Sequence, residues 1–405
     1  MRCYYILSYF TDLVKISIQI TVMPNRFKVI TKEYKSALNK LKYPDSWFWV
    51  RYTINPYSGC AHSCIYCDAR SDRYYLEQDF EHEIIVKENI DKILEQTIKR
   101  SRTMLPDVIG PGGVTDGWQP IEKELEHTRK VLKIIAKYKY PIGISTKSSL
   151  IVRDLDILQK IAQDTWCTVA FTITTINEDL AEFLEPFSSP PLERINALKN
   201  IKEKFPQIQA GVNLIPIIPF LEDNAEDLED IFKTAARAGA DFILFSPGLT
   251  LRDSQAEFFI KKLKESKYNY ALKPLLELYK GQIYPPTDYV KKMHLILYRL
   301  SQDYKLNIRE HRWIPNDFRK WNYKISELLL NKEYFDSVSS GKSNTNMKWA
   351  GLNLNNLEES ILNVYQRGDL HKLKNFDKNI ISIVESILQK AVKREPKKGI
   401  DKFLD

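Results

Sequence analysis

Short apolar runs alternate with longer amphipathic stretches between about residues 51 and 259. The apolar runs predict buried strands at residues 49–54, 107–110, 141–146, 167–175, 210–219 and 241–248. Apolar residues recur at three and four residue spacing in the other stretches, which predicts helices at residues 89–100, 120–138, 154–162, 192–204, 227–239 and 254–265. Six strands alternating with six helices predict parallel pairing through right-handed crossovers.

This rhythm predicts an α/β fold, specifically a partial, open (β/α)6 barrel of the TIM-like kind. A full barrel of eight units takes about 250 residues, and the six units here end near residue 265. A flat, doubly wound sheet is the alternative, because rhythm alone does not distinguish a curved sheet from an open one. Either architecture places the chemistry at the carboxyl ends of the strands.

The remaining sequence divides the chain into four predicted parts. Residues 1–46 form an N-terminal extension, with Met23 as an alternative start, and residues 47–267 form the core barrel. Residues 268–336 form a helical, aromatic and basic part packed on the core, and residues 337–405 form a linker, at 337–346, followed by a basic helical tail. Asp12 and Lys15 interrupt the apolar opening well short of the roughly 20 residues that a membrane span needs.

Composition changes this picture little. The 60 basic and 52 acidic residues leave a net charge of +8, a mild excess that favours an anionic partner. The chain has 43% hydrophobic residues, which argues against a fibre or a wholly disordered protein. Five unevenly spaced cysteines predict free or metal-bound thiols in a reducing compartment, so a cytoplasmic location is expected.

Three of these cysteines lie close together in the run NPYSGCAHSCIYC. Cys60, Cys64 and Cys67 follow the spacing C-x3-C-x2-C on a loop, and such thiolates hold iron–sulfur clusters. A zinc site would need a fourth ligand such as His62, and a redox dithiol of Cys64 and Cys67 would leave Cys60 unexplained. Covalent haem is excluded because Asp68 stands where a histidine is required.

The loop, with Tyr66 before its last cysteine, resembles the signature of radical S-adenosylmethionine (SAM) enzymes. Together with the strings TDGWQPIE, STKSSLIVRD and LEPFSSPPLER, it is similar to the subfamily of spore photoproduct lyase, often labelled DNA repair photolyases, over residues 47–252. The resemblance implies that Cys60, Cys64 and Cys67 bind a [4Fe-4S] cluster whose fourth iron is chelated by SAM. Reductive cleavage of SAM, with electrons from a reductant such as a flavodoxin or ferredoxin, then gives a 5′-deoxyadenosyl radical that abstracts hydrogen from the substrate.

The resemblance and side-chain chemistry together nominate further residues. Thr115 and Asp116 are expected to accept hydrogen bonds from the SAM amino group, and Lys147 and Arg194 to meet its carboxylate. The expected cofactor-binding set is Tyr66, Thr115, Asp116, Lys147, Thr172, Thr174, Arg194, Asn213 and Pro216, with the two threonines of strand 167–175 near the ribose and the last two residues near the adenine. Asp116, Gln119 and Glu122 are the catalytic candidates, although Glu122 also suits a helix start.

One position departs from the family pattern. The characterised lyases have a hydrogen-donating cysteine just ahead of the Thr/Ser-Asp pair, whereas this chain has Gly112, Gly113 and Val114. Cys167 is expected to be inert packing within a strand. We therefore expect a lyase-like or other radical-based modification rather than cleavage of spore photoproduct itself.

Three hypotheses for the function remain open, two of which differ in the substrate. The basic, aromatic stretch 312–324 and the basic tail favour a nucleic-acid substrate, because stacking and phosphate contacts hold single strands. A peptide or small metabolite is the second hypothesis. The third is a cluster-carrying or zinc-carrying binding protein that does not turn SAM over.

Overall fold

The computed structural model describes residues 27–74, 79–80 and 82–394. Most of the predicted N-terminal extension, including Met23, and most of the basic segment at residues 393–402 lie outside these ranges. Within them, no helix is long and apolar enough to span a membrane.

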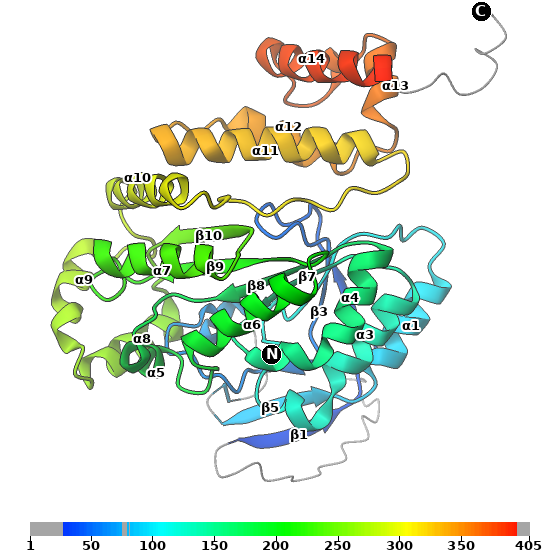
Figure 1. Ribbon diagram of the computed structural model, residues 1–405. Coiled ribbons are helices and arrows are strands. Elements are labelled where there is room, and N and C mark those ends of the chain that lie inside the picture. Colours follow the sequence, from blue (N-terminus) through cyan, green and yellow to red (C-terminus); the bar gives the residue numbers. More distant parts are fainter. Residues whose placement is uncertain (1–26, 75–78, 81, 395–405) are drawn as a thin grey trace, which may run out of the picture.

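The central feature is a seven-stranded sheet in the order β10-β9-β8-β7-β6-β3-β2 (Figure 1). Its strands are β2 (Leu38–Lys40), β3 (Tyr52–Ile54), β6 (Ile109–Pro111), β7 (Ile142–Thr146), β8 (Cys167–Thr172), β9 (Gln209–Ile217) and β10 (Phe242–Pro247). Six of them pair in parallel, and only the edge strand β2 is antiparallel to its neighbour.

The order of these six strands follows the chain without a reversal. A doubly wound sheet would reverse its direction at a switch point, whereas a barrel winds in one direction. Among the described residues, β2 and β10 form two separate edges, so the sheet is open. The predicted partial (β/α)6 architecture is therefore confirmed.

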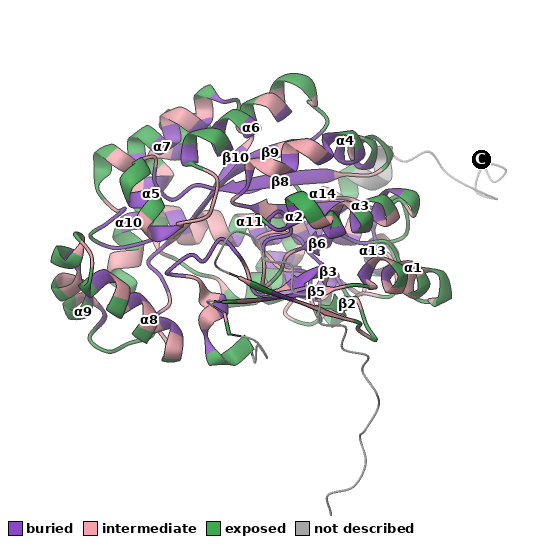
Figure 2. Ribbon diagram, turned by 90° about the horizontal axis from the view of Figure 1, so that it is seen from below, coloured by how far each residue is buried: buried purple, intermediate pink, exposed green. Residues whose placement is uncertain are grey.

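Helices cover the outer face of this sheet. They are α1 (Ile90–Arg100), α3 (His127–Lys137), α4 (Leu155–Asp164), α6 (Pro191–Lys204) and α7 (Ala225–Arg237), with α8 (Asp253–Lys264) following the last strand. The inner sides of the first five pack on the strands in one large apolar core, whereas α8 packs in a separate apolar cluster with the cysteine-rich segment. Figure 2 shows the consequence: strand β8 is buried along its length, while the outward sides of the helices are exposed.

Three elements differ from the sequence prediction. The helix expected at residues 120–138 is two helices, α2 (Glu122–Leu125) and α3, because Glu126 between them adopts a left-handed conformation with φ of 52°. A short helix, α5 (Glu178–Leu184), follows β8. A small second sheet pairs β5 (Glu83–Lys87) with β1 (Lys28–Lys32) and β4 (Tyr57–Ser58).

The C-terminal part is mostly helical, with a non-helical segment between residues 304 and 319. Its helices are α9 (Leu272–Tyr279), α10 (Thr287–Asp303), α11 (Lys320–Ser340), α12 (Thr345–Leu354), α13 (Ile361–Gln366) and α14 (Lys378–Arg394). The last four share an apolar core of their own and lie at the opposite end of the molecule from β1 and β5 (Figure 1). The stretch 337–346, expected to be a linker, ends α11 and begins α12 with a turn at Gly341.

In the basic, aromatic stretch 312–324, both arginines lie inside the molecule, whereas Phe318 and Lys324 are exposed. Arg312 and Arg319 are 5% and 6% exposed. The guanidinium of Arg312 lies 3.7 Å from the centre of the Tyr323 ring and donates to Asn355. These arginines therefore join the C-terminal helices to the barrel, and they provide no ready surface for nucleic acid.

Candidate functional site

The cysteine run forms a loop between β4 and the 3-10 helix η1 (Asp68–Arg70). Two residues of the loop, Gly59 and Ser63, have positive φ angles of 83° and 51°, which turn the chain back on itself. Arg70 closes the loop by donating from Nε to the carbonyl of Cys64 at 2.9 Å and from Nη2 to the carbonyl of Ser63 at 3.2 Å. The loop is thus held by its own hydrogen bonds.

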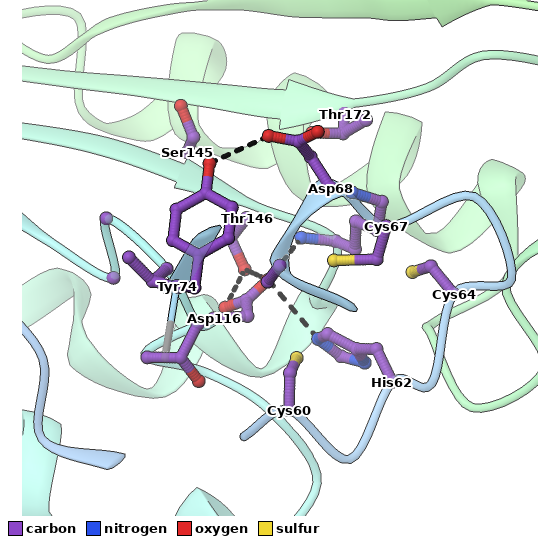
Figure 3. Close-up of a pocket in the computed structure, with 16 residues that line it drawn as sticks. Cys60, His62, Cys64, Cys67, Asp68, Tyr74, Asp116, Ser145, Thr146 and Thr172 are labelled. Atoms are coloured by element: carbon purple, nitrogen blue, oxygen red, sulfur yellow. Dashed lines mark hydrogen bonds and ion pairs between the residues drawn. The ribbon is translucent and has the colours of Figure 1, made fainter. Parts of the chain in front are cut away.

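All three cysteines line one cavity of about 240 Å³, which we call the first cavity. Figure 3 shows their sulfur atoms gathered around a shared space beside His62. The opposite lining comes from the carboxyl ends of strands and the residues after them, namely residues 112–116 after β6, Ser145, Thr146 and Lys147 at the end of β7, and Thr172 at the end of β8. This is where the fold was expected to place its chemistry.

The donor set suits a cluster better than a single ion. In the described residues, no three His, Cys, Asp or Glu side chains are placed to hold one metal ion. A four-iron cluster is a wider object whose thiolates bind different irons, so three sulfurs spread around a cavity fit it. The fourth zinc ligand considered above, His62, is already engaged, since its Nε2 lies 3.2 Å from Asp116 and its Nδ1 lies 3.1 Å from the carbonyl of Phe187.

Burial strongly favours the neutral form of these thiols. It raises the pKa of Cys60 to about 12, with smaller contributions from Asp116 and Cys67, and it raises the pKa of Cys64 well above the ordinary value. A bound metal centre supplies the positive charge that stabilises thiolates.

Asp116 connects the loop to two strand ends. Its carboxylate accepts from the backbone N–H groups of Trp118 and Lys147, both at 2.8 Å, and from the hydroxyl of Thr146 at 2.9 Å, and it faces His62. Burial alone would raise the pKa of Asp116, but His62 and the two backbone groups hold it below its ordinary value. Because its oxygens already have partners, Asp116 orients its neighbours.

Gln119 and Thr115 form hydrogen bonds with the loop backbone next to Cys60, at Gly59 and Ala61. The Thr115 hydroxyl donates to the carbonyl of Gly59 at 2.6 Å. The fully buried Gln119 donates to that carbonyl at 3.3 Å and to Thr115 at 3.0 Å, and its Oε1 accepts from the N–H of Ala61 at 2.7 Å. Thr115 lines the first cavity, whereas Gln119 lies behind it.

Glu122 lies outside the lining of this cavity. It is fully buried and accepts from the hydroxyl of Tyr57, from the N–H of Thr128 at 2.9 Å, and from Arg153 at 2.7 Å. The bond to Thr128 caps the first turn of α3, which agrees with the helix-start role considered for this residue.

Lys147 brings a positive charge into the first cavity. It is the single Lys or Arg among the described lining residues, and no ion pair or hydrogen bond to its ammonium is found in the described part of the chain. The ammonium lies 5.6 Å from the centre of the Tyr66 ring. Burial lowers the pKa of Lys147, but Cys64 and Glu185 outweigh it and raise the pKa above its ordinary value.

Tyr66 and Arg194 lie behind the first cavity and share a buried partner, Glu185. The Tyr66 hydroxyl donates to Glu185, and Arg194 Nη2 pairs with its other oxygen at 2.7 Å. Arg194 Nη1 also donates to the carbonyl of Thr172. This network supports the end of β8 from behind. Glu185 was not singled out from the sequence, although it lies in the string LEPFSSPPLER.

A second cavity of about 400 Å³ adjoins the first and shares Gly112, Gly113, Ser145 and Thr172 with it. Asn213 and Ile215 of β9 line it on one side. Residues Leu41, Asp45, Phe48 and Val50, which precede β3, line it on another side.

Asn213 Nδ2 donates to Ser145 at 3.0 Å, while the buried Asn213 Oδ1 has no partner in the described residues. The nominated Thr174 and Pro216 line neither of these cavities. Pro216 lies in β9, where the pairing with β10 shifts register. Thr174 is buried beyond the end of β8.

Tyr74 and Asp68 also line the first cavity, and neither was selected from the sequence as a site residue. The Tyr74 hydroxyl donates to Asp68 at 2.7 Å, as Figure 3 shows. Burial, with Asp68, raises the pKa of Tyr74 to about 12. Their nearness to Cys67 in the chain was the available signal.

Comparison with known proteins relates this site to a family. Residues 54–235 match the Radical SAM superfamily. An uncharacterised protein of Methanocaldococcus jannaschii is 32% identical over 202 residues, covering 50% of this chain and 72% of that protein. An uncharacterised protein of Mycobacterium tuberculosis H37Rv is 28% identical over 281 residues, covering 67% of this chain and 81% of that protein.

Solved structures agree on the fold. Spore photoproduct lyase complexed with dinucleoside spore photoproduct matches with a TM-score of 0.53 at 17% identity, over 68% of this chain and 79% of that one. A mutant of the same lyase matches with a TM-score of 0.52 at 16% identity, over 71% of this chain and 86% of that one. The three-cysteine loop at the carboxyl edge of an open parallel barrel and the family match lead to one conclusion: this chain belongs to the radical SAM superfamily and is a radical SAM enzyme that uses a [4Fe-4S] cluster and SAM.

Proposed function

We propose that Cys60, Cys64 and Cys67 bind the [4Fe-4S] cluster, that SAM binds in the first cavity, and that hydrogen is abstracted from a substrate group in the second cavity. The observation that carries this proposal is that the three thiols, Lys147 and Thr172 line one cavity. When bound and reduced by one electron, these cofactors supply a 5′-deoxyadenosyl radical.

Lys147 is proposed to bind the SAM carboxylate. Its ammonium reaches the first cavity without a carboxylate partner in the described residues, and a charge-assisted hydrogen bond to an anion would satisfy it. Asp116 positions this lysine through the backbone N–H of Lys147, and His62 in turn contacts Asp116. The backbone of Lys147 is thereby fixed relative to the cysteine loop.

Thr172 and Asn213 are proposed to bind the SAM nucleoside, which would extend from the first cavity to the edge of the second, where Asn213 lies. Thr172 lines both cavities, so it lies at the boundary where cofactor and substrate would meet. The unpartnered Oδ1 of Asn213 is a hydrogen-bond acceptor in a buried position, where an unsatisfied group costs about 1–3 kcal/mol. A ligand hydroxyl or amine would remove that cost.

The other nominated residues are proposed to act through their neighbours. Arg194 and Tyr66 support the end of β8 through Glu185, and Gln119 supports the cysteine loop. Thr174 and Pro216 are proposed to shape the strand ends around the adenine rather than to contact the reacting atoms. Of the catalytic candidates, Asp116 is proposed as a positioning residue, as are Gln119 and Glu122.

The proposed reaction does not use a returning thiol ahead of Thr115. Gly112 has φ of 93°, and a Cβ there would lie 2.5 Å from the carbonyl oxygen of Thr115, so no side chain fits. Gly113 and Val114 carry no thiol, and Cys167 is buried in the core of the sheet. This supports a radical modification different from the lyase reaction.

The second cavity supports a reacting group without a phosphate. Asp45 is its single ionisable lining side chain among the described residues, and it is acidic. A phosphate held there would lack a cation, whereas N–H or O–H donors of the substrate would meet Asp45. A base, a peptide group or a small metabolite fits this description. A nucleic-acid substrate would therefore have to keep its phosphate backbone outside the second cavity. The remaining support for the nucleic-acid hypothesis is the net charge of +8.

The test begins with anaerobic reconstitution with iron and sulfide, reduction by dithionite, addition of SAM, and measurement of 5′-deoxyadenosine. Changing Cys60, Cys64 or Cys67 to Ala is expected to abolish both cluster binding and 5′-deoxyadenosine formation. Cys167→Ala is the matched control, because that thiol is buried in the core away from the cavity, and it should retain both. Normal iron content and turnover after loss of any one loop cysteine would refute the assignment.

Nucleic acid as a substrate is tested separately by gel shift. Salt-sensitive binding of single-stranded DNA or RNA, with altered nucleosides found by mass spectrometry after turnover, would support it. No binding at low salt would leave a peptide or small metabolite as the substrate class.

A further inference from the structure

The back of the cysteine loop packs against helix α8. Cys64 and Tyr66 share an apolar core with Phe259 and Leu263 of this helix. Gln255 of α8 donates to the backbone carbonyl of Tyr66 at 3.2 Å. Because the first cavity occupies the other side of the loop, α8 is a cover between the proposed cluster and solvent.

A short chain of contacts crosses this cover. Arg70 donates to the carbonyl of Cys64, and its guanidinium lies 3.9 Å from the centre of the Phe258 ring on α8. The ammonium of Lys262 lies 5.2 Å from the same ring centre. Two side chains, Arg70 and Phe258, therefore connect the backbone of the cysteine loop with a lysine of the outer part of α8.

The last turn of α8 carries an excess of positive charge, with three lysines against Glu265 at its end. Lys261 and Lys264 are exposed, and Lys262 is half-buried. No carboxylate lies within ion-pair distance of these three lysines in the described part of the chain. Lysines in the last turn of a helix interact favourably with the helix dipole. Their charged groups nevertheless stay in solvent, where a partner protein can meet them.

Apolar side chains are exposed on the two elements that pack against α8. Helix α8 packs against the 3-10 helix η4 (Asn269–Ala271) and against α9, and Figures 1 and 2 both show α8 and α9 side by side. Tyr270 of η4 is 63% exposed and Leu276 of α9 is 44% exposed. We call Phe258, Lys261, Lys262, Lys264, Tyr270 and Leu276 together the α8 surface.

We propose that the α8 surface docks an acidic ferredoxin that reduces the cluster. This inference rests on the proposed function, because it requires the cluster to lie behind α8. One electron passes from the reduced ferredoxin to the cluster, and no bond or proton is transferred. Exposed lysines attract an acidic partner over a distance, and nearby apolar side chains provide the contact area of a small, transient interface.

The experiment compares two charge-reversed proteins in the full-length, reconstituted enzyme. The test variant is Lys261→Glu with Lys264→Glu. The matched control is Lys342→Glu with Lys348→Glu, two exposed lysines around α12 at the far end of the molecule. An acidic ferredoxin with two [4Fe-4S] clusters is the probe. Calorimetry at low and high salt measures its affinity in the oxidised form, and stopped-flow absorbance measures the rate at which its reduced form reduces the enzyme.

The test variant is expected to bind ferredoxin about 10-fold more weakly at low salt and to be reduced by it correspondingly slowly. The control should behave as the unchanged enzyme does. Equal affinity in the test variant and the unchanged enzyme, an equal loss in the control, or no salt-sensitive binding at all would overturn the proposal. Dithionite needs no docking surface, so failure of the unchanged enzyme to cleave SAM with dithionite would instead count against the proposed function.

Discussion

At the scale of single residues, Lys147 offers a direct test of the cofactor assignment. Changing it to Met removes the charge and keeps most of the side-chain volume. A hydrogen bond to a charged group contributes about 1.5–3 kcal/mol, so SAM affinity should fall roughly 10-fold to 150-fold. Iron content should be unchanged, because Lys147 directly follows β7 and is not part of the cysteine loop. Equilibrium dialysis with SAM checks the affinity, and unchanged binding would contradict the assignment.

Gly112 tests the geometry of the loop after β6. Its φ of 93° strains any other residue, and a Cβ would also meet the carbonyl of Thr115 at 2.5 Å. Gly281 is a matched control, because its φ is 76° but nothing lies within 4 Å of an added Cβ. Gly281→Ala should cost about 1–2 kcal/mol of unfolding free energy, from backbone conformation alone. Gly112→Ala should cost more and also weaken SAM binding, as urea unfolding and dialysis can show; equal losses would argue against the contact.

At the scale of elements, the cysteine loop depends on the turn that begins α2. Gln119→Ala leaves the N–H of Ala61 without its side-chain partner and removes one donor to the carbonyl of Gly59. Each buried group left unsatisfied costs about 1–3 kcal/mol. We expect the variant to fold but to lose iron to a chelator several-fold faster. Gln282→Ala, an exposed position, is the control, and equal iron loss in both variants would show that Gln119 does not hold the loop.

The same scale shows what the sequence can and cannot predict. Parallel strands such as β7 and β8 are buried on both faces, so their continuous apolar runs were recognisable and the barrel followed from them. The break at Glu126 was not recognisable, because the residues around it continue a helical pattern. The cysteine spacing identified the loop, but Tyr57 and Arg153, the partners of Glu122, come from distant segments that no local pattern reveals.

At the scale of the whole molecule, the C-terminal part holds the segment that borders the second cavity. Arg309 donates to the carbonyl of Ser46, and the indole of Trp49 donates to the carbonyl of Glu310 at 3.2 Å. These contacts join residues that are far apart in the sequence, and composition alone does not reveal such pairs. For that reason the basic and aromatic residues around position 312 predicted a binding surface, although they form an internal junction. Asp45, which lines the second cavity, belongs to the segment fixed in this way.

Glu310 lies at this junction and should give stability a measurable pH dependence. Its Oε2 accepts from the hydroxyl of Thr168 at 3.1 Å, and its Oε1 has no partner in the described residues. Burial raises the pKa of Glu310 from about 4.5 to about 8; Thr168 and Arg309 offset part of the shift, and Asp45 adds to it. Between these pH values, Glu310 therefore stays protonated in the native protein, whereas in the unfolded chain it releases its proton. Stability from this group is fully present below pH 4.5 and is lost as the pH rises towards 8.

Glu310→Gln keeps a neutral acceptor for Thr168 and removes the linked proton. Relative to the unchanged protein, the variant should become more stable as the pH rises from 5 to 8, as measured by urea midpoints at both pH values. Burial also raises the pKa of Glu222 to about 8, but that residue is present in both proteins, so its contribution cancels in the difference. A difference between the two proteins that stays constant over this range would mean that Glu310 is ionised in the native state, with Arg309 neutralising it at the junction.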